Sequence, residues 1–191
     1  MSELNGKTEV NENPENSKSS DVSEKNENSR KDALDSIDDD LSPEDKSKEF
    51  SEKDKQELKN ETGWSDEIVD SVKSKEEAEI YKNADLQESE VDGKKCLIRN
   101  DIDSGQKDEF GRTNKERMEN GNPPLTKSGE TVELHHIGQK QDSPLAELTT
   151  QEHRGKGNDT ILHDKTKESE IDRSEFSKER QQHWESRSND Y

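Results

Sequence analysis

Residues 130–157 read ETVELHHIGQKQDSPLAELTTQEHRGKG, and this stretch decides the expected fold. The β-branched and apolar content of ETVELHHIG predicts a strand, QKQDS predicts a loop, and PLAELT predicts a second strand. Thr149 or Thr150 then caps a short helix that glycines end. The sequence therefore predicts a β-hairpin followed directly by a helix, which is a ββα unit.

Two adjacent histidines, His135 and His136, lie in the first predicted strand. Neutral imidazole is the commonest metal ligand and titrates near neutral pH. His153 follows on the predicted helix and His163 a short loop later, and this clustering favours a shared site over separately packed histidines. Neighbouring strand side chains point to opposite faces, so His135 and His136 can serve one site only if the strand is twisted or bulged.

The composition of the chain is strongly acidic and poor in apolar residues. Of its 191 residues, 41% are charged and 20% hydrophobic, with a net charge of -19. Residues 1–62 hold 19 acidic and 10 basic residues and one aromatic, Phe50, so we expect a disordered acidic segment there. A helix over 43–60 would have no apolar stripe to dock. This charge argues against passive binding to nucleic acid through a basic surface.

Residues 63–90 predict a helical lead-in to the folded part. Trp64, Ile68, Val69 and Val72 are spaced as on an amphipathic helix. A second helix then opens at Ser74, in a capping-box pattern with a glutamate three residues later.

Residues 91–191 predict the rest of the folded part. VDGKKCLIRNDID reads as a strand pair around Asp92-Gly93, and EFGRTNKERMENGNPP as a polar turn and short helix. The last helix, in EIDRSEFSKERQQHWESR, has Ile171, Phe176 and Trp184 as apolar anchors. Basic residues recur on it every seven positions, at Arg173, Arg180 and Arg187, and could form one basic face.

The single cysteine and the lack of long apolar runs indicate in which compartment the protein is made. The sole cysteine, Cys96, excludes an intramolecular disulfide, and we expect it to be a packed core thiol. The sequence has no apolar run long enough to span a bilayer and no Sec signal peptide at its N-terminus. We therefore expect a protein that is cytoplasmic at synthesis and does not bind membranes, and that would need a route other than a cleaved Sec signal to leave the cell.

Four segments together resemble the LHH group of the HNH/endonuclease VII superfamily nucleases, which occur as C-terminal domains of bacterial polymorphic toxins. The segments are GRTNKERMENGNPPL, ELHHIGQKQDSPLAELT, EHRGKGNDTILHDKT and IDRSEFSKERQQHW. The resemblance covers roughly residues 85–191 and implies an α+β fold, a small ββα-metal (HNH-like, treble-clef-type) nuclease core with flanking helices. On it, residues 91–191 are the nuclease domain.

The resemblance also implies roles for individual residues. His135, His153 and His163 would hold one divalent metal ion, with zinc, nickel, manganese and magnesium all open. His136 would be the general base that activates water. Arg154 would hold a phosphate, with an exposed helix end as the alternative interpretation of this arginine. The implied activity is metal-dependent endonuclease cleavage of phosphodiester bonds, in DNA or alternatively RNA. A cognate immunity protein would be the partner.

Several points stay open at this stage. The wider superfamily often has an asparagine on the second strand that orients the base, and PLAELT has none. Glu133 and Glu152 could orient an imidazole, although solvated positions are the simpler interpretation for both. His183 is expected to pack rather than bind metal. A non-catalytic metal clip that binds a partner protein, or a nuclease that is not secreted, would use the same histidines.

Overall fold

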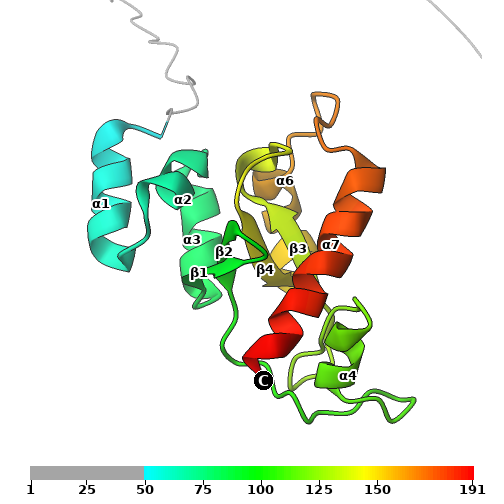
Figure 1. The fold of residues 1–191 in the computed structure, drawn as a ribbon. Helices are drawn as coiled ribbons and strands as arrows, with labels where there is room; N and C mark the ends of the chain where they lie inside the picture. The colour runs from blue at the N-terminus through cyan, green and yellow to red at the C-terminus, as the bar shows by residue number, and fades with distance from the viewer. Residues whose placement is uncertain (1–49) are drawn as a thin grey trace, which may run out of the picture. The chain divides into compact units, whose positions relative to one another are not determined.

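Both predicted hairpins lie side by side in one mixed sheet of the computed structural model, which describes residues 50–191 (Figure 1). β1 (Gln87–Val91) pairs antiparallel with β2 (Lys94–Ile98), and β3 (Val132–His136) pairs antiparallel with β4 (Leu145–Thr149). β2 and β4 run parallel, so the strand order is β1-β2-β4-β3. β3 is therefore an edge strand of this sheet.

The turn of the first hairpin follows from its two central residues. Asp92 and Gly93 have φ values of 53° and 75°, the left-handed conformation that two-residue hairpin loops require. Aspartate tolerates this conformation and glycine adopts it freely, which confirms the predicted strand pair around this dipeptide.

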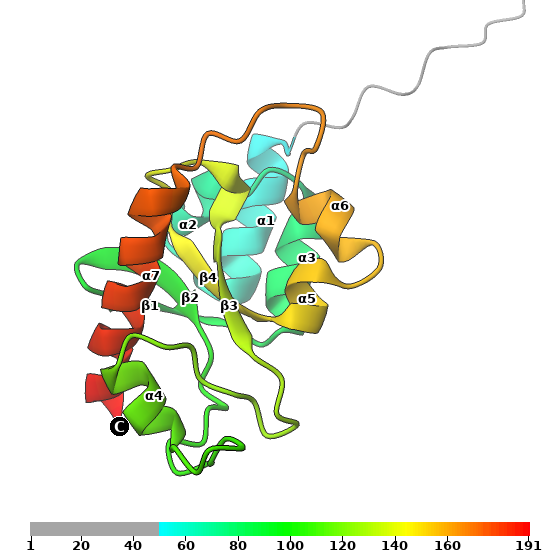
Figure 2. The ribbon, with the colours of Figure 1, turned by 90° about the vertical axis from the view of Figure 1, so that its right-hand side faces the viewer.

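Helices cover both faces of the sheet (Figure 2). One face carries α1 (Glu52–Thr62), α2 (Asp66–Ser71), α3 (Lys75–Asn83), α5 (Thr150–Arg154) and α6 (Asn158–Leu162). The other carries α4 (Asn114–Glu119) and α7 (Arg173–Arg187), and two 3-10 turns, η1 (Ile137–Gln139) and η2 (Ser188–Asp190), complete the elements. The fold is therefore mixed α+β, with β3, β4 and α5 as its ββα unit.

Strand alternation divides the core into two hydrophobic clusters, one on each face of the sheet. Leu97, Ala146 and Leu148 pack with the α1–α3 side, whereas Val132 and Leu134 pack with the α7 side. The sheet is thus apolar on both faces, and its helices bury it from both sides.

The expected N-terminal boundaries are wrong within the described residues. Residues 50–62, assigned to a disordered segment, include α1, whose Leu58 is buried and whose neighbour Phe50 packs against the same cluster. A capping box at Ser51 fixes the start of this helix. Leu58 and Phe50 therefore dock the helix, together with ion pairs to α2 and α3 such as Lys55–Asp70 and Lys82–Glu61. The expected boundary between residues 90 and 91 falls inside β1, and residues 1–49 lie outside the described part.

The predicted helices are confirmed, with two differences in detail. The Ser74 side chain accepts a hydrogen bond from the Glu77 amide, but the Glu77 carboxylate binds elsewhere, so the capping box is half formed. Trp184 of α7 is buried as expected, whereas Ile171 lies just before the helix and is only partly buried. None of the helices in residues 50–191 combines the length and apolar character needed to cross a membrane.

Candidate metal and nucleic-acid site

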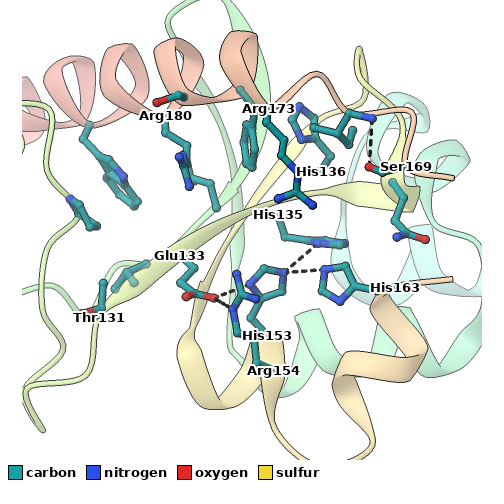
Figure 3. A pocket seen from close by; sticks show the side chains of 18 of the residues that line it. Thr131, Glu133, His135, His136, His153, Arg154, His163, Ser169, Arg173 and Arg180 are labelled. Carbon is teal, nitrogen blue, oxygen red and sulfur yellow. Dashed lines mark hydrogen bonds and ion pairs between the residues drawn. The ribbon is translucent and has the colours of Figure 1, made fainter. Parts of the chain in front are cut away.

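A cleft of about 960 Å³ follows the open edge of β3 (Figure 3). Its walls come from β3, from α5 and the segment after α6, from α7, and from the turn that follows α4. Four of the five histidines line it, together with five cationic side chains, Arg154, Lys165, Lys167, Arg173 and Arg180. These cations come from α5, from the segment after α6 and from α7, so the fold brings them to one cleft from three parts of the chain.

Local sequence signals place the histidines. Thr149 caps α5 through a capping box with Glu152, so the helix begins where β4 ends. This abrupt start turns His153 back toward β3. α6 then ends with His163 as its C-cap residue. The Thr149 cap predicted from the sequence is confirmed.

Three of the histidines meet at one point. His135 Nδ1 lies 3.1 Å from His153 Nε2, which in turn lies 3.1 Å from His163 Nε2. One ring nitrogen from each residue lies within 4.8 Å of the other two. His135 and His153 are buried and His163 is half-buried. The residues that the sequence grouped as ligands are therefore brought together.

Carboxylates fix the orientation of two of these rings. His153 Nδ1 lies 2.6 Å from Glu133 Oε2, and His163 Nδ1 lies 3.0 Å from Asp159 Oδ1. An ionised carboxylate can only accept a hydrogen bond, so each Nδ1 carries the hydrogen and each Nε2 presents a lone pair. Such carboxylate–histidine pairs are typical of metal-binding histidines.

The surroundings keep the two buried rings neutral. Burial lowers the pKa of His135 well below its usual range, and the neighbouring histidines lower it further. Burial also lowers the pKa of His153, against the opposing effect of Glu133. Neutral imidazole is the form that binds metal ions.

The donor set fits a divalent cation. When both rings are neutral with their hydrogens on Nδ1, the Nε2 lone pairs of His153 and His163 face each other at 3.1 Å, an arrangement that a positive ion would stabilise. In a tetrahedral zinc site with Zn–N bonds of about 2.0–2.1 Å, ligand nitrogens are about 3.3 Å apart, close to the two 3.1 Å separations that involve His153. Imidazole donors suit zinc, nickel and copper better than magnesium.

His136 lies on the other face of β3. Its ring packs against Phe176 of α7, with the ring centroids 4.4 Å apart. Its Nε2 lies 2.9 Å from Glu179 Oε2, at an angle unsuited to a hydrogen bond. Burial opposes ionisation of Glu179, but contacts with His136 and Lys94 outweigh it and lower the pKa of this carboxyl.

The expected distortion of β3 is absent. Each residue from Val132 to His136 pairs in unbroken register with β4, so His135 and His136 point to opposite faces. Both still border the cleft, because β3 is an edge strand and the cleft extends around it. The twist or bulge that the sequence interpretation required is therefore not found, and the two imidazoles reach the cleft from opposite faces of the strand.

A buried glutamate fixes the turn after the two histidines. Glu77 of α3 accepts hydrogen bonds from the Gly138 amide at 2.9 Å and from the Tyr81 hydroxyl at 2.7 Å. Gly138 has φ +69°, and a Cβ there would lie 2.2 Å from the Ser71 carbonyl oxygen. Only glycine fits this close approach, which holds the end of β3 against α2 and α3.

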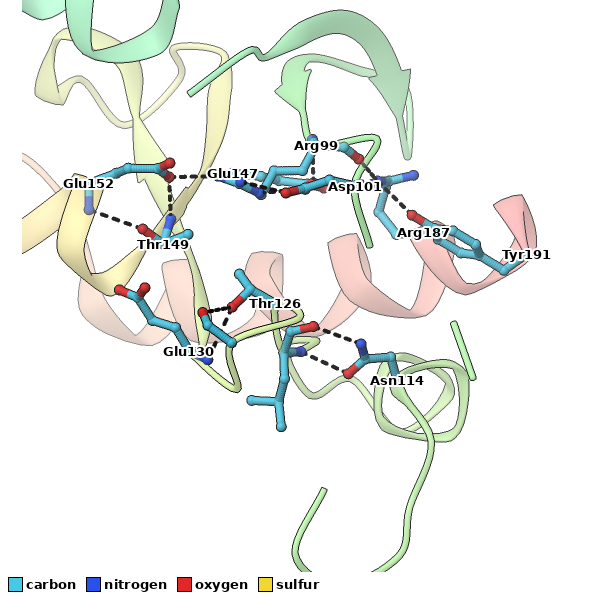
Figure 4. A network of polar contacts seen from close by, with 12 residues as sticks. Arg99, Asp101, Asn114, Thr126, Glu130, Glu147, Thr149, Glu152, Arg187 and Tyr191 are labelled. Carbon is cyan, nitrogen blue, oxygen red and sulfur yellow. Dashed lines mark hydrogen bonds and ion pairs between the residues drawn. The ribbon is translucent and has the colours of Figure 1, made fainter. Parts of the chain in front are cut away.

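The expected basic face of α7 is only partly right. Arg173 and Arg180 extend from α7 toward β3 (Figure 3). Arg187 is instead buried, and its guanidinium binds Glu147, with 2.7 Å between Nε and Oε1, in the polar network of Figure 4. Arg154 is 59% exposed at its side chain and donates to Glu133 at 2.8 Å.

Three other residues considered in the sequence have contacts that stabilise the fold and do not contribute to the histidine cluster. His183 is buried and bonds Glu147 at 2.8 Å, so it packs as expected. Cys96 is fully buried, and burial together with Glu147 raises the pKa of its thiol to about 12. Glu152 binds Arg99 and the Thr149 amide rather than a histidine.

Sequence reasoning missed two contributions to the site and ranked a third too low. Glu133 was named as a group that could orient an imidazole, with a solvated position as the simpler interpretation, and it contacts His153. Asp159 lies four residues before His163 on one helix, a spacing that could have revealed the pair. Glu179 comes from a distant helix, and no local sequence pattern connects it to His136.

The comparison with protein families agrees with the geometry. Residues 113–190 match the family model LHH, described as a nuclease of the HNH/ENDO VII superfamily with conserved LHH. In this chain, that signature is Leu134-His135-His136 at the end of β3. No solved structure matches the chain. Residues 113–190 are thus similar to the LHH nucleases of the HNH/endonuclease VII superfamily.

Proposed function

We propose that this protein is a metal-dependent endonuclease in which His135, His153 and His163 bind one divalent metal ion. The observation that carries the proposal is the convergence of their three ring nitrogens at one end of a cleft lined by cations. His136 borders the same cleft from the other face of β3. A ligand set and a separate imidazole base are thereby available to one substrate.

The residues divide the work of phosphodiester hydrolysis. His136 takes the proton from the attacking water, which a neutral imidazole near pH 7 can do. Phe176 and Glu179 hold its ring, and Glu179 supplies the orientation for which the second strand has no asparagine. Arg154, Arg173 and Arg180 bind the phosphates on either side of the cleaved bond.

A divalent ion bound to the three imidazoles would act as a Lewis acid that stabilises charge on the phosphate and on the leaving oxygen. Zinc or nickel suits the all-nitrogen set best, and manganese or magnesium would bind more weakly.

A catalytic site accounts for the geometry better than a metal clip does. Structural zinc sites close with four protein ligands, whereas catalytic sites keep a position open. Within residues 50–191, the ligand group has three members and borders a large cleft. The clip remains the second candidate because the same three histidines would serve it.

The biological setting follows from the family resemblance. We propose DNA as the substrate, RNA as the alternative, and a toxin role in a bacterial effector with a cognate immunity protein as partner. We also propose that the nuclease unit begins near residue 50, because α1 to α3 pack against the strands that carry the site.

Cleavage of supercoiled plasmid and of folded RNA, with and without a chelator, tests this proposal. We expect metal-dependent nicking of plasmid by the wild type and none by His136→Ala. Wild-type cleavage that is insensitive to chelators and unchanged in His136→Ala would contradict the proposal. Retained metal binding with no cleavage of either nucleic acid would favour the metal clip.

A further inference from the structure

A surface loop before α4 carries an exposed aromatic side chain. Phe110 is 75% exposed, and Phe110 and Ile161 are the large apolar side chains exposed within residues 50–191. Both tryptophans are buried. A single exposed apolar residue is ordinary on protein surfaces, so exposure by itself assigns nothing. What distinguishes Phe110 is the way its loop is held.

A buried carboxylate holds the loop in shape. The Asp108 side chain is 4% exposed and accepts hydrogen bonds from the Phe110 amide at 3.0 Å and the Arg112 amide at 2.9 Å. It also accepts from Arg112 Nε at 2.9 Å and from Arg117 Nη1 at 2.8 Å. These bonds fix the backbone on both sides of Phe110. The aromatic side chain is therefore presented on an ordered tip.

The same contacts connect the loop to the cleft. Arg117 of α4 binds Asp108 and also donates from Nε to the Pro123 carbonyl at 2.9 Å, and Pro123 lines the cleft. Asn114 adds a second connection, because its amide bonds the carbonyls of Asp103 and Leu125. Hydrogen bonds through α4 thus connect the loop to this wall of the cleft.

The loop also faces the correct side of the molecule. In Figure 1 the segment between β2 and α4 projects toward the side on which the edge strand β3 lies. Figure 2 looks at that side and shows the segment below β3, next to α4. A nucleic acid that extends from the cleft past α4 would reach this loop.

We propose that Phe110 and Arg112 form a stacking site for an unpaired base of a nucleic acid bound in the cleft, which deepens the nuclease function proposed above. The Arg112 guanidinium carbon lies 5.3 Å from the Phe110 ring centroid, so a cation accompanies the aromatic face. Stacking of a base on an aromatic ring contributes about 1–3 kcal/mol and tolerates any sequence.

The negative charge of the chain makes a non-ionic contact with nucleic acid useful. With a net charge of -19, the protein repels a polyanion at long range, and salt-screened attraction is limited to the cleft. A stacking contact is non-ionic, so it adds affinity that salt does not remove. It also favours substrates with unpaired bases over fully paired duplex.

Equilibrium binding in the full chain with His136→Ala, which prevents cleavage, tests the site. The probes are a labelled 12-mer of deoxythymidine and a blunt-ended duplex, measured by fluorescence anisotropy at two salt concentrations. Relative to this parent, Phe110→Ala should weaken single-strand binding by roughly 5- to 150-fold, the equivalent of about 1–3 kcal/mol. Its salt dependence should stay unchanged, because no charge is removed.

Two matched variants separate stacking from simple apolar contact. Phe110→Trp should retain the parent affinity, and its tryptophan emission should be quenched by the 12-mer beyond the change seen with Trp64 and Trp184 alone. Phe110→Leu should bind as weakly as Phe110→Ala. Parent-like affinity of Phe110→Leu would overturn the proposal and indicate an apolar protein contact instead.

The failure of this site is distinguishable from the failure of the nuclease function. Parent-like affinity of Phe110→Ala, with no tryptophan quenching, would overturn the stacking site and leave the nuclease function intact. A parent that binds neither probe, combined with a wild type that cleaves neither nucleic acid, would overturn both.

Discussion

The Nε2 atoms of His153 and His163 lie 3.1 Å apart although each ring has its Nδ1 hydrogen bonded to a carboxylate. Two lone pairs thus face each other across a gap that a cation would fill. This relationship connects the site to metal chemistry more directly than the presence of two adjacent histidines in the sequence.

The carboxylate that orients His153 should control metal affinity. We expect Glu133→Gln to weaken zinc or nickel binding by roughly 10- to 100-fold, because the ring loses its fixed orientation and part of its basicity. Isothermal titration calorimetry measures this. Glu130→Gln is the control, since it removes the same charge from a side chain that bonds only the Gln151 amide among the described contacts. Equal affinities for the two variants would contradict the assignment.

The carboxylate beside the base should act on turnover rather than on metal. Glu179→Gln should lower kcat by roughly 10- to 100-fold, a part of what a well-placed base contributes. KM and metal affinity should stay near the wild-type values, because Glu179 lies on the opposite face of β3 from the three ligands. Glu175→Gln, an exposed change on the same helix, is the control. A loss of metal binding in Glu179→Gln would indicate a purely structural role.

The sequence predicted local structure well because local patterns specify it. Two hairpins, the Thr149 cap and the ββα unit all follow from residues within a few positions of one another. Docking of α1 was missed because its apolar contribution is a single leucine and a preceding phenylalanine, too little to form a visible stripe. An amphipathic helix is recognised in a sequence by apolar residues that recur at helical spacing, and a single apolar residue gives no such periodicity.

The site was predictable in its residue types but not in its geometry. The four clustered histidines were found, and three of them meet. His135 and His136 lie on opposite faces of β3, and both border the cleft because β3 is an edge strand. The strand order that makes β3 an edge strand depends on the parallel pairing of β2 with β4. That pairing joins segments far apart in the chain. For the same reason Glu179 could not be assigned to His136.

The buried network around Glu147 should make the protein sensitive to acid. Burial opposes its ionisation, but contacts with His183 and Arg187 outweigh burial and lower the pKa of this carboxyl. Because the folded-state pKa lies below the ordinary value of 4.5, this stability is present above that value and is lost as pH falls through the folded-state pKa. We therefore expect the free energy of unfolding to decrease as the pH is lowered below 4.5. Urea titrations between about pH 3 and 7 measure this change.

Replacement of Glu147 should remove both the stabilisation that its ionised carboxylate provides and the pH dependence of that stabilisation. We expect Glu147→Gln to destabilise the protein by about 3–5 kcal/mol at pH 7, since the buried Arg187 would lose its buried counter-ion and keep only the ion pair with the exposed Asp190. The difference from wild type should shrink at acid pH. Glu90→Gln on the exposed side of β1 is the control. A constant difference across the pH range would argue against the Glu147 assignment.

The turn after the histidines should tolerate only glycine. Gly138 and Gly129 both have positive φ, but a Cβ at Gly138 would collide with the Ser71 carbonyl whereas one at Gly129 would meet open space. Both alanine variants have the backbone strain of about 1–2 kcal/mol. Gly138→Ala should lose about 1–3 kcal/mol more in urea unfolding, because packed backbone must move. Equal losses would show that the contact with α2 is unimportant.

The division of roles between metal ligands and base is the central claim, and one paired measurement tests it most directly. Zinc binding by calorimetry and plasmid nicking are measured on the same preparations of wild type, His136→Ala and His153→Ala. We predict that His136→Ala binds zinc as the wild type does and does not nick, whereas His153→Ala loses both properties. Nicking by His136→Ala at the wild-type rate, or wild-type zinc affinity in His153→Ala, would contradict the account.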